Sequence, residues 1–427
     1  MLKKIRGIAK GVVAKRGDKG DYIVALDIGT EFVKALIARI EGDELHIIGV
    51  GRAHQQLTDM QAGAISDIQG VVANCDVALT QAETQAGLSA RTAIIGIAGE
   101  LVKGTTTSVR CTRKDSNKEL DVTEVERIIS LVQDRAATRA QEEVTWEMGG
   151  KDAELKLVNS ALVGIDIDGY KVTNPVGFQG KDVLVQLYTA FAPLIHIGAL
   201  ERTAQELDLD LLAVAAEPFA VSRSVIGNDP SETMSAILMD VGGGTTDIAV
   251  VNEGGVEGTK MFSIGGRSFT RSIEKNLNVG FSEAEDLKLA LEGSSLSKSK
   301  RVEVEQALNK TLDVWLAGVV LALEEFDKLD NLPHQILLCG GGASLDLLVQ
   351  KLENSTWYKK LPFTRKPTVK LIEPDQTVDI FDKTGKASDH TYITAMGLLR
   401  VGLDTISQDD PKRLQGIKQR IDKVLKV

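Results

Sequence analysis

The chain has 427 residues, which is enough for two or more domains. Apolar residues make up 43% and charged residues 26% of it, an ordinary globular composition, and the net charge of -10 argues against a nucleic-acid-binding protein. Three cysteines and five histidines are scattered, without the spacing of a disulfide framework or a zinc site. No apolar run reaches the ~18 residues of a membrane span, and no secretory signal is evident, so we expect a cytoplasmic protein.

Both ends of the chain contrast with this acidic average. Residues 1–20 and 408–427 each carry a cluster of lysines and arginines, with apolar residues recurring at steps of three and four, the pattern of an amphipathic helix. Such a helix can lie in the headgroup layer of an anionic membrane, where each basic residue contributes about 1 kcal/mol. The alternative is a terminal helix docked on its own domain, with a solvated basic face.

Between the two ends, strands and helices alternate as in an α/β fold. In the first half, residues 155–191 are rich in strand-forming residues, and Gly42-Asp43 is typical of a hairpin turn. The other strands expected there are 22–28, 33–40, 45–51, 93–98 and 211–216, and the helices are 67–87, 121–135, 195–207 and 217–226. Residues 227–230 form a natural break between halves.

The second half repeats this plan. Its expected strands are 236–241, 247–252, 258–264 and 335–339, and its helices are 267–277, 282–291, 301–330 and 344–353. Residues 295–300 are polar and are expected to form a loop. A meander of strands followed by helices therefore occurs twice, which indicates a duplicated topology rather than a short repeat.

Two similar turns lie at corresponding places in these halves. The first segment is Ile-Val-Ala-Leu-Asp-Ile-Gly-Thr at 23–30, and the second is Ala-Ile-Leu-Met-Asp-Val-Gly-Gly-Gly-Thr-Thr-Asp at 236–247. Each predicts a buried strand that ends in a tight turn. Glycine lets backbone N–H groups approach a phosphate, and carboxylates can hold Mg²⁺ through its waters. Two such turns facing each other would suit a magnesium-bound nucleoside triphosphate.

These turns supply the first candidate site residues. The candidate phosphate contacts are Gly29, Thr30, Gly242, Gly243, Gly244, Thr245 and Thr246. Asp27 and Asp240 are the candidate magnesium residues, acting through water, and Asp240 and Asp247 are candidate catalytic residues. Glu217 begins an expected helix and could orient or deprotonate an attacking water, but its spacing alone favours charge complementarity with the helix start.

A third glycine-rich turn, Gly340-Gly341-Gly342, follows the strand at 335–339 and would suit close approach to a nucleoside. Glu285 and Lys288 share a helical face and form either part of the nucleoside site or a surface ion pair. The remaining candidate cofactor contacts are Gly265 and Gly266. The chain lacks a Walker-type loop and a dinucleotide fingerprint, so the nucleotide would be held between opposed turns.

The three turns, in this order and spacing, resemble the two phosphate motifs and the adenosine motif of the actin-like ATPase superfamily. The resemblance implies two ribonuclease-H-like lobes that close on Mg-ATP. It also implies that Glu217 matches the glutamate of the first connecting motif, and that Glu285 and Lys288 match the adenosine-side pair. Residues 390–397 resemble the second connecting helix.

Within the superfamily, the chain is most similar to the FtsA family of bacterial cell-division proteins. Residues 63–67 and 172–180 carry this resemblance, although Asn174 and Phe178 replace an Asp and a Met of the family pattern. The segment after Lys288 is short for FtsA, in the lobe through which that family binds the ring protein FtsZ. A short lobe is closer to PilM, the related cytoplasmic protein of pilus assembly.

The resemblance implies a division of the chain into lobes, an FtsA-type insert and terminal helices. The expected units are a basic helix at 1–20, a first lobe at 21–91 and 194–227, an inserted α+β subdomain at 92–193, a second-lobe core at 228–266 and 333–404, a helical nucleotide-side subdomain at 267–332, and a basic membrane helix at 408–427.

The function expected from this resemblance is an ATP-binding protein that assembles at the inner membrane face and tethers the division machinery. ATP with Mg²⁺ would act as the assembly switch, with at most slow hydrolysis, and the partners would be further copies of the chain, an anionic membrane and an FtsZ-like protein. A PilM-like scaffold that binds the cytoplasmic tail of a membrane protein is the alternative. A small-molecule kinase is a third hypothesis, but no candidate catalytic Asp near an acceptor pocket supports it.

Overall fold

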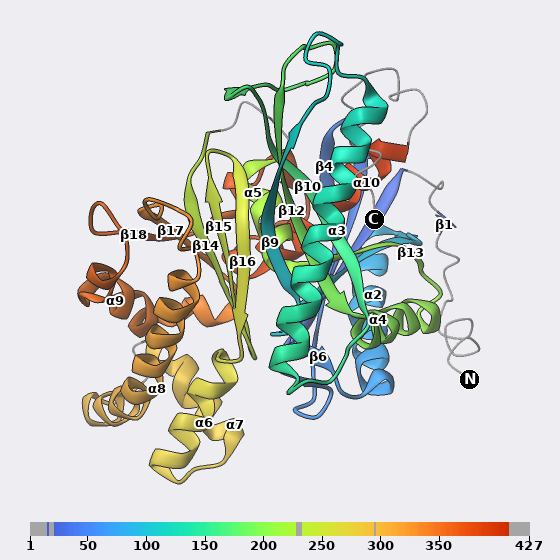
Figure 1. Ribbon diagram of the computed structural model, residues 1–427. Coiled ribbons are helices and arrows are strands. Elements are labelled where there is room, and N and C mark those ends of the chain that lie inside the picture. The colour runs from blue at the N-terminus through green and yellow to red at the C-terminus, as the bar shows by residue number, and fades with distance from the viewer. Residues whose placement is uncertain (1–14, 17–20, 228–232, 294–295, 410–427) are drawn as a thin grey trace.

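The computed structural model describes residues 15–16, 21–227, 233–293 and 296–409 (Figure 1). The helices predicted at 1–20 and 408–427 therefore lie almost entirely outside the described residues. Lys15–Arg16 is an exception and corrects the first prediction: it forms strand β1, which pairs in parallel with β7 (Leu88–Ser89). In the part of the chain that is described, no helix combines the length and apolar character needed to cross a bilayer.

The first body of the molecule is built on a six-stranded sheet. Its strands in spatial order are β13 (Asp210–Ala216), β8 (Thr92–Ile97), β2 (Tyr22–Ile28), β3 (Phe32–Glu41), β4 (Glu44–His54) and β19 (Ile380–Asp382). The meander β2–β3–β4 is antiparallel, and β8 joins β2 in parallel. The predicted turn at Gly42-Asp43 is confirmed, since Gly42 has a φ of +68°, which favours glycine.

Helix α2 (Ile68–Ala86) covers one face of this sheet. Asp67 caps its first turn by accepting hydrogen bonds from the N–H groups of Gln69 and Gly70. The helix lies so close to β4 that a Cβ on Gly51 would lie 1.8 Å from the carbonyl oxygen of Ala78. Glycine is therefore required at this point of the strand.

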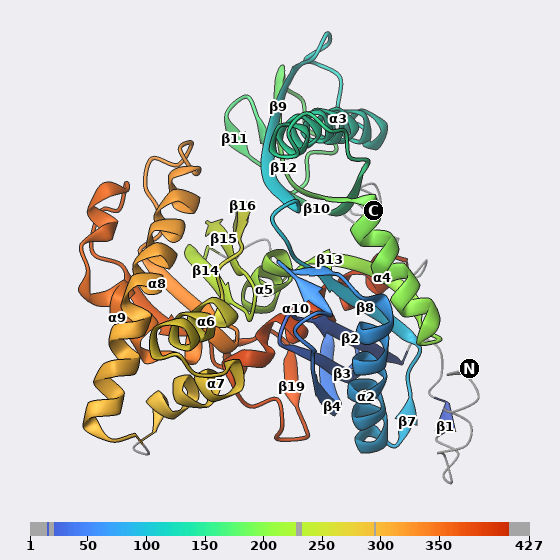
Figure 2. The same cartoon turned by 90° about the horizontal axis from the view of Figure 1, so that it is seen from below.

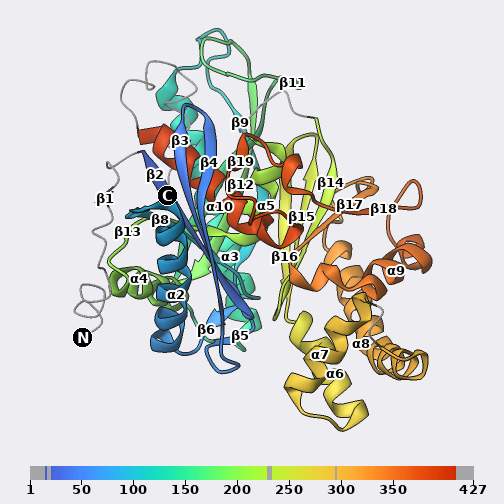
Figure 3. The same cartoon turned by 180° about the vertical axis from the view of Figure 1, so that it is seen from behind.

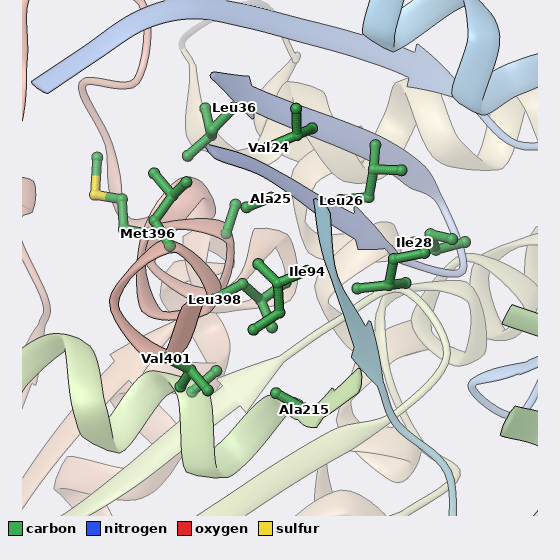
Figure 4. Close-up of a cluster of buried hydrophobic side chains, with 14 of the residues drawn as sticks. Val24, Ala25, Leu26, Ile28, Leu36, Ile94, Ala215, Met396, Leu398 and Val401 are labelled. Carbon is green, nitrogen blue, oxygen red and sulfur yellow. The ribbon is translucent and has the colours of Figure 1, made fainter. Parts of the chain in front are cut away.

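Two crossing helices, α5 (Glu217–Ile226) and α10 (Ile393–Asp409), lie between the lobes (Figures 2 and 3). A Cβ on Gly397 would lie 2.0 Å from the carbonyl oxygen of Ala220, so the helices cross at backbone contact. Figure 4 shows Ala25, Ile94 and Leu398 gathered between α10 and the six-stranded sheet. This core fixes the end of β2, and with it the first glycine turn.

The second sheet has nine strands and joins two parts of the chain. Its order is β11 (Tyr170–Lys171), β10 (Leu155–Ile167), β12 (Asp182–Pro193), β9 (Lys103–Thr112), β16 (Gly255–Phe262), β15 (Thr246–Asn252), β14 (Ala236–Val241), β17 (Gln335–Cys339) and β18 (Thr368–Leu371). The strands β9 to β12 and helix α3 (Val122–Glu147) form a separate body at the top of Figure 2, with its own core. Its strand β9 pairs with β16 through two residue pairs, Thr105 with Gly258 and Gly104 with Thr259.

The second lobe carries helices beside β14 to β18 (Figure 1). These are α6 (Gly266–Leu277), α7 (Phe281–Leu289), α8 (Lys298–Glu324) and α9 (Asp346–Asn354). The remaining elements are β5 (Met60–Gln61), β6 (Ala64–Ile65), α4 (Leu194–Glu206), and the 3₁₀ turns η1 (Ala290–Glu292), η2 (Gly341–Ser344), η3 (Trp357–Lys360), η4 (Pro374–Gln376) and η5 (His390–Tyr392).

The α/β class and the two-lobed plan are confirmed, but several boundaries change. Helix α3 continues to Glu147 beyond the predicted 135, and α8 begins at Lys298, inside the loop predicted at 295–300. Strand β8, assigned by sequence to the insert, pairs with β2 in the first sheet. Strand β19 and helix α10, assigned to the second lobe, pack on the first sheet, because β19 pairs with β4 and α10 buries its apolar face there.

Candidate functional site

The two predicted phosphate turns meet between the lobes. The first connects β2 to β3, and the second connects β14 to β15. A Cβ on Gly244 would lie 2.6 Å from Oγ1 of Thr30, and a Cβ on Gly243 would lie 2.8 Å from Cβ of Glu31. Only glycine allows this approach, so the glycine run brings two turns from opposite halves of the chain together.

A cavity of about 290 Å³ opens beside the paired turns. Most of the candidate residues predicted from sequence line it: Asp27, Gly29, Thr30, Glu217, Asp240, Gly242, Gly243, Thr245, Asp247, Gly266, Glu285, Lys288, Gly340, Gly341 and Gly342. The predicted residues that do not line it are Gly244, Thr246 and Gly265.

These three residues instead support the turns from behind. Gly244 packs against Thr30. The hydroxyl of Thr246 donates a hydrogen bond to the carbonyl oxygen of Ile264 at 2.7 Å and accepts one from Nε1 of Trp315 at 2.9 Å. A Cβ on Gly265 would lie 2.6 Å from the carbonyl oxygen of Gly242. Their positions make them supports of the turn rather than parts of the cavity wall.

Four acidic side chains converge on the cavity and are buried: Asp27, Asp240, Asp247 and Glu217. Burial, followed by the charge of Asp27, raises the pKa of Glu217 well above its ordinary value. Burial, followed by the charge of Asp240, does the same to the pKa of Asp247. The cluster therefore holds more negative charge than its surroundings compensate, a situation that an added cation would relieve.

Lys34 is the cation inside this cluster, and the sequence analysis missed it. Its Nζ lies 2.8 Å from Oδ2 of Asp27. Burial opposes the charge on Lys34, but Asp27, through its charge and hydrogen bond, and Asp240 together raise its pKa, so the ammonium stays charged. The hairpin register could have revealed the pair, because Asp27 and Lys34 lie directly opposite each other on β2 and β3.

The acidic groups fit a magnesium ion that keeps its waters. Oδ1 of Asp247 is buried and has no hydrogen-bond partner among the described residues. The same part of the chain contains no group of three or more His, Cys, Asp or Glu side chains arranged to hold a metal directly. Magnesium typically retains several waters and uses few carboxylates, so indirect binding through Asp27 and Asp240 suits these side chains.

The other end of the cavity is formed by the second lobe. Nζ of Lys288 lies 2.8 Å from Oε2 of Glu285 and 2.9 Å from Oγ1 of Thr270. The two predicted residues are therefore a partly buried pair in the cavity wall rather than a surface ion pair. Gly340 has a φ of +81°, and a Cβ there would lie 2.0 Å from Oδ1 of Asp240, which makes glycine necessary.

Glu217 both begins a helix and lines the cavity. It is the first residue of α5, as charge complementarity predicts. It also lines the cavity, and only 8% of its surface is exposed. A Cβ on Gly96 would lie 2.9 Å from Oε1 of Glu217, so the neighbouring strand leaves room for this carboxyl group.

The amino-acid sequence is similar to that of known cell-division proteins. The sequence model of the family described as cell division protein FtsA matches residues 237–397. The FtsA of Bacillus subtilis strain 168 is 27% identical over 277 residues, which cover 64% of this chain and 59% of the relative. The FtsA of Streptococcus pneumoniae serotype 2 is 26% identical over 349 residues, which cover 77% of this chain and 72% of the relative.

A solved structure described as a PilM-PilN type IV pilus biogenesis complex is similar in fold. The TM-score is 0.64 at 14% sequence identity, and the match covers 89% of this chain and 98% of that one. The long sequence matches are to FtsA proteins, whereas this structural match shows the shared architecture. The chain is thus similar in sequence to FtsA proteins and similar in fold to this protein of pilus biogenesis.

Proposed function

We propose that this chain binds ATP with Mg²⁺ in the cavity between its lobes and uses the nucleotide as a switch for assembly. The observation that carries the proposal is the meeting of two glycine turns beside four buried acidic groups and Lys34. Backbone N–H groups and a lysine favour phosphate oxygens, and the surplus acids favour a hydrated cation. A protein surface without such a ligand would have little reason to concentrate these groups.

Each group has a proposed role. Gly29 and Thr30, with the turn at 242–246, would bind the phosphates, and Lys34 would neutralise part of their charge. Asp27 and Asp240 would hold Mg²⁺ through its waters, and the bound ion would supply charge neutralisation at the phosphates. At the other end, Glu285, Lys288 and the glycines at 340–342 would contact the nucleoside.

The proposed role of the site is a switch, with at most slow hydrolysis. Glu217 and Asp247 line the cavity and could orient a water. A protein that retains its triphosphate for a long time can use lobe closure to report the nucleotide state. This supports a role as a switch, with catalysis secondary.

The same proposal divides the chain functionally. We propose a first lobe on the six-stranded sheet that includes β8, β19 and α10, a second lobe on β14 to β18 with its helices, and an insert that begins after β8 and ends with β12. The nucleotide would touch only the two lobes. Filament contacts with further copies of the chain and contacts with an FtsZ-like division protein would lie on outer surfaces.

We further propose that the terminal segments attach the assembled protein to the inner face of the cell membrane, where it would tether the division machinery. The support is the basic amphipathic pattern of residues 1–20 and 408–427. The full chain should sediment with anionic vesicles, and high salt should weaken this binding. Binding by a chain that lacks both segments would exclude the proposal.

The nucleotide switch is tested with Asp240→Ala. Loss of Mg-ATP binding in calorimetry, together with loss of ATP-dependent assembly on lipid monolayers in electron microscopy, is the expected result. Unchanged ATP affinity and unchanged assembly in this variant would rule out the switch.

A second candidate function is a scaffold that binds the tail of a membrane protein in pilus assembly. The similarity in fold to the PilM-PilN complex favours it, because one match covers 89% of this chain. Peptide pull-downs separate the two functions. Capture of an FtsZ tail supports division, and capture of the N-terminal peptide of a pilus membrane protein supports the scaffold.

A further inference from the structure

We propose that Arg267 and Glu31 form a latch between the lobes, and that Arg267 also binds a phosphate oxygen of the nucleotide. This inference rests on the proposed function, because the anion is the phosphate chain of the bound nucleotide. Neither residue belongs to the motifs that predict the site. Their side chains come from opposite halves of the chain, and both line the cavity.

The latch is a direct ion pair across the cleft. Nε of Arg267 lies 2.7 Å from Oε2 of Glu31, although 236 positions separate the two residues. Arg267 is the second residue of α6 in the second lobe, and Glu31 lies between β2 and β3 in the first. Nη1 of Arg267 also donates to the carbonyl oxygen of Leu57 at 3.4 Å, a second contact with the first lobe. Separation of the lobes would break both contacts.

The same residues are attached to the phosphate turns. The backbone N–H of Arg267 donates to the carbonyl oxygen of Gly243 at 2.7 Å. Glu31 directly follows Thr30, and a Cβ on Gly243 would lie 3.1 Å from the backbone nitrogen of Glu31. The ion pair therefore bridges the first phosphate turn and the second. A ligand between these turns is within the immediate surroundings of the guanidinium group.

Nη2 of Arg267 has no hydrogen-bond partner within the described part of the chain. Only 8% of the residue surface is exposed, and among the described residues nothing accepts a hydrogen bond from Nη2. A buried guanidinium N–H that has lost water and gained no acceptor is unfavourable. Arginine matches phosphate oxygens in charge and geometry, so a phosphate is the natural acceptor in a cavity wall.

Two functions follow for one side chain. Glu31 fixes the guanidinium through Nε, which leaves Nη2 oriented for the ligand. A bound phosphate would attract Arg267 of the second lobe, so nucleotide binding would stabilise the closed arrangement of the lobes. Without nucleotide, the ion pair alone would favour closure.

The experiment separates the two contacts with two variants and a matched control. Arg267→Gln removes both, whereas Glu31→Gln removes the latch and keeps the cation. Arg271→Gln is the control, since Arg271 is exposed on the same helix. Calorimetry measures the affinity for Mg-AMPPNP and Mg-ADP, and a dye pair with one label on each lobe measures closure in the full chain. Thermal unfolding reports whether each variant folds.

We expect Arg267→Gln to lower the affinity for both nucleotides at least tenfold. The cleft should also be wider in this variant when no nucleotide is bound. Glu31→Gln should also widen the cleft, but less, because the contact of Arg267 with Leu57 remains. It should lower the affinity for both nucleotides less than threefold, and Arg271→Gln should change neither cleft width nor affinity. If Arg267→Gln folds poorly, Arg267→Lys replaces it in the experiment. This variant keeps the charge but loses the planar fork, so it should retain part of the wild-type affinity. Wild-type affinity in either Arg267 variant would exclude the phosphate contact.

An unchanged cleft in Glu31→Gln would exclude the latch. If the unmodified chain binds no nucleotide, the proposed function and the phosphate contact both fail. The latch would still be tested by the cleft width of Glu31→Gln measured without nucleotide. These outcomes distinguish failure of the inference from failure of the function on which it rests.

Discussion

The two phosphate turns have the same sequence pattern but different charge environments. In the first turn, Asp27 is paired with Lys34. In the second turn, Asp240 accepts a hydrogen bond from the hydroxyl of Thr394, and Asp247 has one oxygen without a partner in the described chain. The duplicated topology thus gives one turn with an internal cation and one with uncompensated acids. This difference predicts distinct responses to substitution at each turn.

Lys34→Met should have the largest effect, because it removes the cation shared by the acidic cluster. Loss of one partner of a buried ion pair destabilises proteins by about 3–5 kcal/mol. Lys34 also lies where phosphates are expected, so Mg-ATP binding should be lost. Urea unfolding and calorimetry measure the two effects.

Lys156→Met is the control for this variant, since Lys156 forms an exposed ion pair with Glu201 and exposed pairs contribute little. Equal loss of stability in both variants would show that the first turn does not depend on its internal cation.

Gly340→Ala should have the next largest effect. Gly340 lies in the third glycine turn, but its substitution affects the second phosphate turn through Asp240. The new Cβ would overlap with Oδ1 of Asp240 at a φ of +81°. Backbone strain of this kind costs of order 1–3 kcal/mol, and displacement of Asp240 should weaken Mg-ATP at least tenfold in calorimetry. Gly198→Ala is the control, because Gly198 lies in α4 and an added Cβ there would meet no atom within 4 Å outside its own stretch of helix. Full Mg-ATP affinity in Gly340→Ala would contradict the proposed role of Asp240.

The uncompensated acids predict a pH dependence of stability without nucleotide. Because the folded state raises the pKa of Asp247 and Glu217, it binds protons more strongly than the unfolded state. Their contribution to stability is present below the ordinary carboxyl pKa and is lost as the pH rises through the folded pKa. Asp247→Asn removes one of these acids, so this variant should unfold at a higher temperature than the wild type at neutral pH.

A gain of ~1 kcal/mol corresponds to roughly 1 °C in a chain of this length, and scanning calorimetry from pH 4 to pH 8 measures it. Mg²⁺ should reduce the difference between variant and wild type. Asp286→Asn, at an exposed position, is the control. If the difference in unfolding temperature between Asp247→Asn and the wild type is the same at every pH, titration of Asp247 is excluded as its cause.

Thr394→Val should weaken Mg-ATP binding less than Lys34→Met or Gly340→Ala, since it removes one hydrogen bond to Asp240 and keeps the side-chain volume. Such a bond to a charged group is worth about 1.5–3 kcal/mol at most sites, and its loss should raise the pKa of Asp240 further. We expect Mg-ATP affinity to fall about threefold to tenfold. Thr394→Ser keeps the hydroxyl and should bind like the wild type, so equal weakening in both variants would exclude the hydrogen bond.

The sequence alone determined the local parts of the site. An apolar run that ends in Asp, an apolar residue and glycine forms a buried strand and a turn wherever it lies, so both turns and most strands and helices could be predicted. Helix starts were also predictable at Asp67 and Glu217, because caps and first-turn charges act over a few residues. The resemblance then supplied the arrangement of the lobes.

Only the tertiary structure decided which distant groups meet. The ion pair between Glu31 and Arg267 joins positions far apart in the chain, and no local pattern encodes it. Strand β19 and helix α10 follow the second lobe in sequence but are part of the first lobe. Strand β19 pairs with β4 of the first sheet, and α10 buries its apolar residues against that sheet. Local hydrogen bonding fixes each turn, whereas long-range packing decides which turns, charges and lobes lie together.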